Sequence, residues 1–322
     1  MTAIISVKNL SVDYTLGPGE KLHALRTVDL DVSLGESVAI VGESGCGKST
    51  FAYSLVKLVA NNSVTAGDIT VNGLSVLNAS REELQNMRGA VAAMIFQDPA
   101  ASLNPLFSVR EQIFEGILAH IKPAPDRGSM EASASDLLED SGFDEPGRIL
   151  NSYPHQLSGG EQQRVMIAIA LSCSPKILIA DEPTTALDVT VQAQIMELLA
   201  KLKKEHGLTL LLITHDLNLA VALCRRVVVM YAGEIVEDGP IGSIRDAAHP
   251  YTHALFDIIP DINSASREFN VIKGSVPDLR LSVTGCAFEP RCARAREKCK
   301  KTHPDMMDGA GCFFPYEKGK GG

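Results

Sequence analysis

The eight residues Gly42-Glu43-Ser44-Gly45-Cys46-Gly47-Lys48-Ser49 constrain this 322-residue chain more than any other segment. They fit the pattern G-x-x-x-x-G-K-[ST], and they lie between an apolar run at 37–41 and a segment of helical periodicity at about 49–59. The glycines let several backbone N–H groups converge on phosphate oxygens, and the following helix adds its positive end. Lys48 is then placed to reach the β- and γ-phosphates and Ser49 to ligate Mg²⁺. A glycine-rich turn without a ligand is the simpler alternative, and the strand–helix context disfavours it.

The order of apolar and helical segments predicts the fold class. Short apolar runs at 91–96, 177–180, 208–214 and 227–230 alternate with helical segments such as 191–203, which indicates a mostly parallel sheet covered on both faces. The runs at 4–14 and 28–34 are typical of an antiparallel hairpin, with a turn at Gly17-Pro18-Gly19. Helical, polar segments at 109–151, broken by Pro123 and Pro125, indicate an inserted subdomain at about 98–168. We expect a main domain over 1–250 and a separate extension over 251–322, where the composition changes.

Composition and charge exclude several classes of protein. Asp and Glu number 39 against 30 Lys and Arg, so the net charge is −9. A general nucleic-acid binder normally needs a basic surface, so we expect no nucleic-acid partner. No apolar run approaches the roughly 18–20 residues of a membrane-spanning helix, and residues 1–10 lack the layout of a signal peptide. We therefore expect a soluble protein that faces the cytoplasm.

Two acids follow the apolar run 177–180. Ligands of open α/β sheets bind beyond the carboxyl ends of the strands, where Asp181 and Glu182 are expected. Successive residues point in different directions, so one acid can hold Mg²⁺ while the other faces an attacking water. We assign Asp181 to the metal and Glu182 to the general base. The alternative is that both acids only solubilise a strand end.

The segment Leu157-Ser158-Gly159-Gly160-Glu161-Gln162-Gln163-Arg164 precedes an apolar helix. Ser158 and Glu161 form the pattern of a capping box, which by itself would only start a helix. Two adjacent glycines at a helix start cost about 1 kcal/mol each relative to alanine. They are explained if bare backbone N–H groups must approach an anion closely.

This segment resembles the signature of ATP-binding-cassette (ABC) ATPases, and it stands in that family's order between the phosphate loop and Asp181-Glu182. The resemblance implies a P-loop NTPase core, with ATP and Mg²⁺ as ligands. It makes Gln97 the glutamine that senses the γ-phosphate and metal, His215 the switch histidine, and Tyr14 the aromatic residue that stacks on adenine. Thr185-Ala186-Leu187-Asp188 is similar to the D-loop, with Thr185 where the family more often has Ser.

The resemblance implies three groups of site residues. Catalysis falls to Glu182, His215 and Gln97, and Mg²⁺ to Ser49, Gln97 and Asp181. The nucleotide-binding set is Tyr14, Gly42, Glu43, Ser44, Gly45, Cys46, Gly47, Lys48, Ser49, Thr50, Ser158, Gly159, Gly160, Glu161 and Asp188. In the family two ATPase units clamp two ATP molecules head to tail, so we expect hydrolysis to require a dimer.

Further segments are similar to the oligopeptide/dipeptide-importer branch of the family. They are Phe96-Gln97-Asp98-Pro99, Ser102-Leu103-Asn104-Pro105, Tyr153-Pro154-His155-Gln156, His249-Pro250-Tyr251-Thr252 and Cys286-Ala287-Phe288-Glu289-Pro290-Arg291-Cys292. The resemblance implies an ATPase bound peripherally to the cytoplasmic side of the cell membrane. Its implied partners are two membrane-spanning permease subunits, a second and related ATPase, and an extracytoplasmic binding protein.

Three other functions are weighed against peptide import. Nickel importers use very similar ATPases, so nickel is the nearest alternative cargo. A soluble ABC ATPase acting on ribosomes or DNA is disfavoured, because the chain has one cassette, no heptad run and no basic excess. A nucleotide-binding regulator without turnover is disfavoured because Glu182 and His215 are both present.

Four of the seven cysteines, Cys286, Cys292, Cys299 and Cys312, fall close together near the C-terminus. Four thiolates suit either a tetrahedral zinc or an iron–sulfur cluster. Zinc ribbons use tighter pairs than these, and the importer branch is thought to carry a [4Fe–4S] cluster here, which we favour over zinc. Unligated thiols are the third possibility. The Arg and Lys residues around these cysteines, Arg291 among them, are expected to form a solvated basic face. The alternatives are that they offset the charge of the thiolates or contact lipid headgroups.

Overall fold

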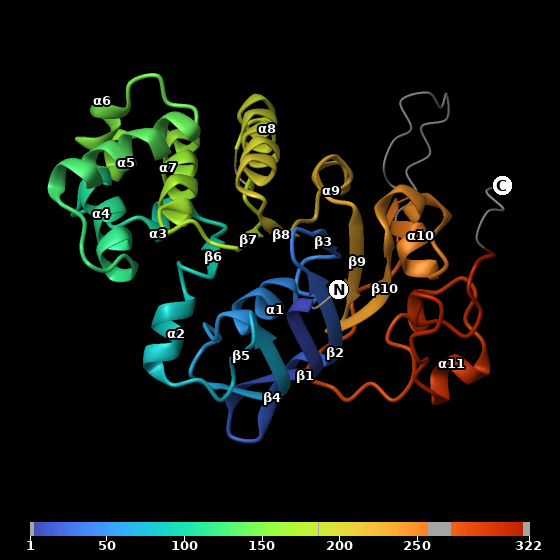
Figure 1. Ribbon diagram of the computed structural model, residues 1–322. Coiled ribbons are helices and arrows are strands. Elements are labelled where there is room, and N and C mark those ends of the chain that lie inside the picture. The colour runs from blue at the N-terminus through green and yellow to red at the C-terminus, as the bar shows by residue number, and fades with distance from the viewer. Residues whose placement is uncertain (1–2, 186, 257–271, 318–322) are drawn as a thin grey trace, which may run out of the picture. The chain divides into compact units, whose positions relative to one another are not determined.

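The computed structural model describes residues 3–185, 187–256 and 272–317 (Figure 1). The chain divides into two compact units. Unit 1 comprises residues 33–36 and 78–212, and unit 2 comprises residues 3–32, 37–77 and those from 213 onward. Each unit is described by itself.

Unit 2 contains the strand that leads into the phosphate loop. β3 (Ser37–Val41) is buried at every residue and pairs in parallel with β9 (Arg226–Tyr231), while β10 (Glu234–Pro240) pairs antiparallel with β9. Strands buried on both faces are apolar throughout rather than alternating, which explains why this run was recognisable from the sequence. The predicted mostly parallel arrangement is therefore confirmed here, with an antiparallel strand at the edge.

Unit 2 also contains a four-stranded sheet with the order β2-β1-β4-β5. Its strands are β1 (Ala3–Gly17), β2 (Glu20–Ser33), β4 (Ser63–Val71) and β5 (Leu74–Ser75). β1 and β2 are joined by Pro18-Gly19, and Gly19 has the positive φ of 79° that such a tight turn requires. β1 pairs antiparallel with β4, so the predicted antiparallel subdomain is confirmed.

The helices of unit 2 are short. They are α1 (Lys48–Leu55), α9 (Leu217–Leu223), α10 (Pro250–Phe256) and α11 (Glu297–Lys301), with 3-10 turns η2 (Ile241–Asp246) and η3 (Glu289–Arg291). α1 ends four residues before the predicted 59, because Lys57 adopts a left-handed φ of 51° that a helix cannot accommodate.

Unit 1 contains β6 (Ala92–Ile95), β7 (Ile177–Asp181) and β8 (Thr209–Ile213), in the order β8-β7-β6. β6 and β7 are parallel, and Ile95 is opposite Ala180. The carboxyl ends of these two strands therefore meet at one edge of the sheet, and both are followed by predicted site residues. α8 (Val189–His206) follows β7 and is longer than predicted at both ends.

The inserted helices of unit 1 form one group, which Figure 1 shows in green. They are α3 (Pro99–Ser102), α4 (Val109–His120), α5 (Arg127–Asp140), α6 (Pro146–Leu150), η1 (Pro154–Gln156) and α7 (Gly159–Leu171), while α2 (Arg81–Met87) precedes β6. Residues from 103 to 168 supply a shared core that includes Ile113, Leu138 and Val165. Burial of that core, rather than helix propensity, stabilises helices this short. The predicted helical subdomain is thus confirmed.

Among the residues that the structure describes, no helix combines the length and the apolar character required to cross a bilayer.

Candidate functional site

The predicted site residues divide between the two units. Tyr14, residues 42–50 and His215 belong to unit 2, whereas Gln97, residues 158–161, Asp181, Glu182 and Asp188 belong to unit 1. The four cysteines belong to unit 2 as well.

The backbone of the phosphate loop requires glycine at two positions. Gly42 has a φ of 154°, and a Cβ atom there would collide with the carbonyl oxygen of Met230. Gly47 has a φ of 104°, and its Cβ atom would lie 2.5 Å from the carbonyl oxygen of Ala24. Both obstacles are backbone atoms and cannot rotate away. The loop is thus pressed against β9 and β2, and side chains are excluded from both positions.

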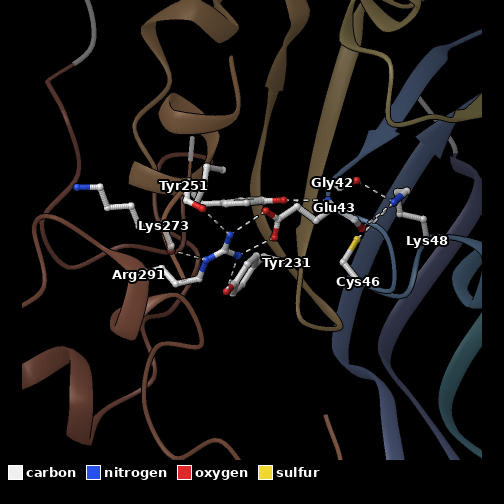
Figure 2. A network of polar contacts seen from close by, with 9 residues as sticks. Gly42, Glu43, Cys46, Lys48, Tyr231, Tyr251, Lys273 and Arg291 are labelled. Atoms are coloured by element: carbon white, nitrogen blue, oxygen red, sulfur yellow. Dashed lines mark hydrogen bonds and ion pairs between the residues drawn. The ribbon is translucent and has the colours of Figure 1, made fainter. Parts of the chain in front are cut away.

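Lys48 points back into the loop (Figure 2). Its Nζ donates hydrogen bonds to the carbonyl oxygens of Gly42 at 2.8 Å and Glu43 at 3.0 Å, and it lies 3.7 Å from Cys46 Sγ. Both Lys48 and Cys46 are buried, and burial raises the pKa of the Cys46 thiol. The Cys46 side chain is therefore an uncharged thiol that lines the loop, and Lys48 is the basic residue there.

Tyr14 and His215 occupy the remaining predicted positions of unit 2. The Tyr14 hydroxyl lies 3.4 Å from Thr50 Oγ1, so β1 places this aromatic ring beside the first turn of α1. His215 is exposed directly after β8, and Asp216 caps the next helix, α9. Ser49 and Thr50 are half-buried in α1.

The predicted acids of unit 1 lie at the end of β7. Asp181 is fully buried, and Glu182 adopts an unusual left-handed φ of 48°. Two neighbours donate hydrogen bonds to the same oxygen, Glu182 Oε2: Gln97 Nε2 at 3.0 Å and Thr185 Oγ1 at 2.9 Å. The parallel pairing of β6 with β7 therefore brings Gln97 and Glu182 together. A strained backbone held by its surroundings is common at functional sites.

The signature segment forms the expected capping box at the start of α7. Ser158 Oγ accepts from the Glu161 backbone N–H at 3.3 Å, and Glu161 Oε2 accepts from the Ser158 N–H at 2.9 Å. The ion pair with Arg148 and these bonds hold the pKa of Glu161 below its ordinary value.

Gly160 has a packing role that the sequence did not indicate. A Cβ atom on Gly160 would lie 2.8 Å from Val191 Cγ1 of α8, so the glycine allows two helices to approach. Gly159 has more room, with Leu187 Cδ2 at 3.7 Å. Asp188 caps α8 by accepting from the N–H groups of Thr190 and Val191, each at 3.0 Å. Ala186 of the predicted D-loop lies outside the described residues.

The four C-terminal cysteines line one cavity, together with aromatic and proline side chains such as Phe288, Phe313 and Pro304. The Cys286 N–H donates to the Cys299 carbonyl at 2.8 Å. Burial, with a smaller contribution from the other three cysteines, raises the pKa of Cys286 to about 11.

In the described part of the chain, however, no three His, Cys, Asp or Glu side chains are grouped so that they could hold a metal ion. Tetrahedral zinc at about 2.3 Å would require thiolates about 3.8 Å apart. The arrangement of the described residues therefore supports neither the predicted iron–sulfur cluster nor the zinc alternative.

Three residues near the phosphate loop were not recognised from the sequence. Arg291 forms an ion pair with Glu43 of the loop, the Tyr251 hydroxyl accepts from the Glu43 N–H, and Tyr231 contacts Arg291 (Figure 2). The prediction of a solvated basic face is wrong for Arg291, whose side chain is 5% exposed. It holds for Arg294 and Arg296, which are exposed. A contact between residues 248 positions apart leaves no signal in a single sequence.

Two family profiles match the chain. The profile described as "ABC transporter" matches residues 25–185, and "Oligopeptide/dipeptide transporter, C-terminal region" matches residues 236–299. Similar proteins include "Oligopeptide transport ATP-binding protein AppD" of Bacillus subtilis, 40% identical over 99% of both chains. "Dipeptide transport ATP-binding protein DppD" of Escherichia coli is 42% identical over 98% of both chains.

Solved structures agree with these matches. The post-hydrolysis dimer of the ATP-binding cassette MJ0796, bound to ADP and Pi, has a TM-score of 0.67 and 32% identity, covering 74% of this chain and 98% of the other. CbiO1 of Clostridium perfringens, described as part of the ABC transporter complex cbiONQ, has a TM-score of 0.63 and 28% identity, covering 75% and 90%.

Proposed function

The chain belongs to the ABC transporter family of ATP-binding proteins, and on that premise we propose that it hydrolyses ATP to power the import of oligopeptides or dipeptides across a cell membrane. The observation that carries the proposal is the loop at 42–49, whose glycine-dependent backbone surrounds Lys48. The C-terminal match and the names of the relatives support peptides as the cargo.

The residues of the two units take separate roles. Lys48 and the loop N–H groups bind the β- and γ-phosphates, and Tyr14 stacks on adenine. Glu182 orients and deprotonates the attacking water, with Gln97 and Thr185 fixing its carboxylate. Mg²⁺, when bound, neutralises phosphate charge. Ser49, Gln97 and Asp181 would hold it, and the burial of Asp181 at a strand end suits a carboxylate whose charge is matched by a cation.

Completing the site takes a second ATPase. Ser158, Gly159, Gly160 and Glu161 would contact the nucleotide of a partner subunit, whether a copy or a related chain, and His215 the γ-phosphate. The dimeric state of the solved relatives supports this arrangement. Two permease subunits and an extracytoplasmic binding protein complete the transporter, with this chain peripheral on the cytoplasmic side.

Uptake in whole cells tests the cargo. A strain lacking the gene is complemented with the wild-type chain or with Glu182→Gln, and uptake of labelled dipeptides, longer peptides and Ni²⁺ is measured. We expect peptide uptake to be restored by the wild-type chain alone. Restoration of Ni²⁺ uptake without peptide uptake would replace the peptide proposal with nickel import. Unchanged uptake of every solute would contradict a transport role.

We also infer that the four cysteines hold a [4Fe–4S] cluster rather than zinc. Their convergence on one cavity supports a shared ligand, and their spacing, which lacks the tight pairs of zinc ribbons, favours a cluster over zinc. Metal analysis after purification without oxygen tests this, with iron and acid-labile sulfide expected in about equal amounts. Protein that contains neither iron nor zinc would rule out both versions, and the thiols would then be unligated.

A further inference from the structure

Glu43, the second residue of the phosphate loop, is held at three points (Figure 2). Its carbonyl oxygen accepts from Lys48 Nζ at 3.0 Å, and its backbone N–H donates to the Tyr251 hydroxyl at 2.9 Å. Its carboxylate accepts two hydrogen bonds from Arg291, from Nη1 at 2.7 Å and from Nη2 at 2.9 Å. The residue that supports the phosphate-binding lysine is thus bound, through its own backbone and side chain, to the C-terminal extension.

Arg291 is itself fixed, which a surface ion pair would not require. Its side chain is 5% exposed and that of Glu43 is 25% exposed. The guanidinium also donates to the carbonyl oxygens of Lys273 at 3.1 Å and Ile272 at 3.4 Å, and to the Tyr231 hydroxyl at 3.3 Å. Bidentate pairs of this kind fix geometry as well as contributing energy. The orientation of the Glu43 carboxylate is therefore set from the extension.

An aromatic cluster supports the same contact. Tyr231 and Tyr251 have ring centroids 4.6 Å apart, and each lies 5.3 Å from Phe288. All three are buried, the Tyr231–Phe288 contact is edge-on, which is a favourable geometry for aromatic pairs, and the other two contacts are tilted. Tyr231 ends β9, the strand that pairs with β3, while Phe288 immediately precedes η3. The loop, the strand and the cysteine-bearing segment meet at this cluster.

We propose that Arg291 is a positioning residue for the phosphate loop, so that the affinity of this chain for ATP depends on the C-terminal extension. Arg291 acts through Glu43 and does not touch the nucleotide. It stands directly before Cys292, so a change in the cysteine-bearing segment reaches Lys48 through two side chains. The inference rests on the proposed role of the loop in binding ATP.

Equilibrium titration of the full chain with ATP and Mg²⁺ tests the proposal. We expect Arg291→Ala to raise the Kd for ATP by about tenfold, which corresponds to the loss of one charge-assisted pair. Arg291→Lys keeps the charge but not the bidentate geometry, so it should give a smaller rise, by about threefold. Adding Arg291→Ala to the variant Glu43→Gln should raise the Kd for ATP no further, because the two substitutions break the same contact.

The matched control is Arg280→Ala. Arg280 forms a bidentate pair in the same extension, but that pair is exposed and its partner is Asp278 rather than a residue of the loop. It should leave the Kd for ATP unchanged, while thermal unfolding without nucleotide reports stability for every variant. If Arg291→Ala unfolds, Arg291→Lys and the single variant Glu43→Gln decide the outcome, and a rise in the Kd for ATP in both is expected.

Failure of the positioning role and failure of the proposed function give different results. Wild-type ATP affinity in Arg291→Ala and Arg291→Lys, with binding abolished in Lys48→Ala, would overturn the positioning role and leave the proposed function intact. Equal affinity of the wild-type chain and Lys48→Ala would overturn the proposed function of the loop, and the positioning role with it.

Discussion

At the residue scale, the proposed general base, Glu182, has a strained backbone. Its φ of 48° is unfavourable for a residue with a Cβ atom, yet Gln97 and Thr185 bind its carboxylate and hold it in one position. A general base must be presented in a fixed orientation toward the water that it deprotonates. The strain at Glu182 is therefore consistent with its proposed role.

Glu182→Gln tests that role. The amide keeps the size of the side chain but cannot accept a proton, so we expect turnover to fall by about 100-fold or more, with ATP binding retained. Steady-state ATPase activity of the assembled transporter and equilibrium ATP binding are the two measurements. Normal steady-state hydrolysis by this variant would remove Glu182 as the base.

Gly47→Ala and Gly45→Ala form a matched pair in the phosphate loop. Both glycines have positive φ, but a Cβ atom at Gly45 meets nothing within 4 Å, whereas at Gly47 it meets the Ala24 carbonyl oxygen at 2.5 Å. We expect Gly45→Ala to lower the free energy of unfolding by about 1 kcal/mol and Gly47→Ala by more than about 2 kcal/mol. Chemical denaturation measures both, and equal losses would show that the Ala24 contact is unimportant.

At the scale of elements, the residues at the start of α7 have two explanations, which are initiation of the helix and contact with a nucleotide. α4 begins with an identical capping box, formed by Ser108 and Glu111, in the same helical group. Capping explains Ser158 and Glu161 fully, and packing against Val191 explains Gly160. A test of the signature must therefore separate helix initiation from nucleotide contact.

Ser158→Ala compared with Ser108→Ala makes that separation. Each should lower the free energy of unfolding by about 1 kcal/mol, because each removes one N-cap. Only Ser158→Ala should reduce ATP turnover by the assembled transporter. Equal turnover in both variants would indicate that Ser158 acts only as a cap.

The ion pair of Arg148 with Glu161 gives α7 a pH dependence. The pair lowers the pKa of Glu161, so its contribution to stability is present above the ordinary value of 4.5 and is lost as the pH falls through the lowered pKa. We expect Arg148→Gln to destabilise the chain by less than about 1 kcal/mol at pH 7 and by a smaller amount near pH 3, where more of Glu161 is protonated. Denaturant titrations at both pH values measure this, and a constant difference would exclude the pair as its cause.

At the scale of the whole molecule, the predicted site residues are distributed over two units. Lys48 and His215 belong to one, and Glu182 and the signature belong to the other. If two copies of this chain complete each other's sites, we expect the specific ATPase activity of the purified chain to rise with protein concentration. Activity assayed over a hundredfold range of concentration checks this. A constant specific activity above background would show that one chain suffices, whereas no activity at any concentration would indicate a related chain as the partner.

The sequence predicted those features that arise from local pattern. Buried strands are continuous apolar runs, and the phosphate loop and capping box have fixed spacings, so β3, β7 and the Ser158 cap were all recognisable. The features that the sequence did not predict depend mostly on contacts between residues far apart in the chain. Three features come from neighbours or backbone angles that spacing does not record. They are the burial of Arg291 against Glu43, the need for Gly160 beside Val191, and the end of α1 at Leu55, before the left-handed Lys57.

The pairing of β3 with β9 has a consequence for translation of this protein. β3 leaves the exit tunnel long before residues 226–231, and at about 5–20 residues per second that interval lasts of the order of ten seconds or more. During that time a fully apolar strand has an open edge, the kind of surface that aggregates. The nascent chain therefore needs chaperone protection most while β9 is still being synthesised.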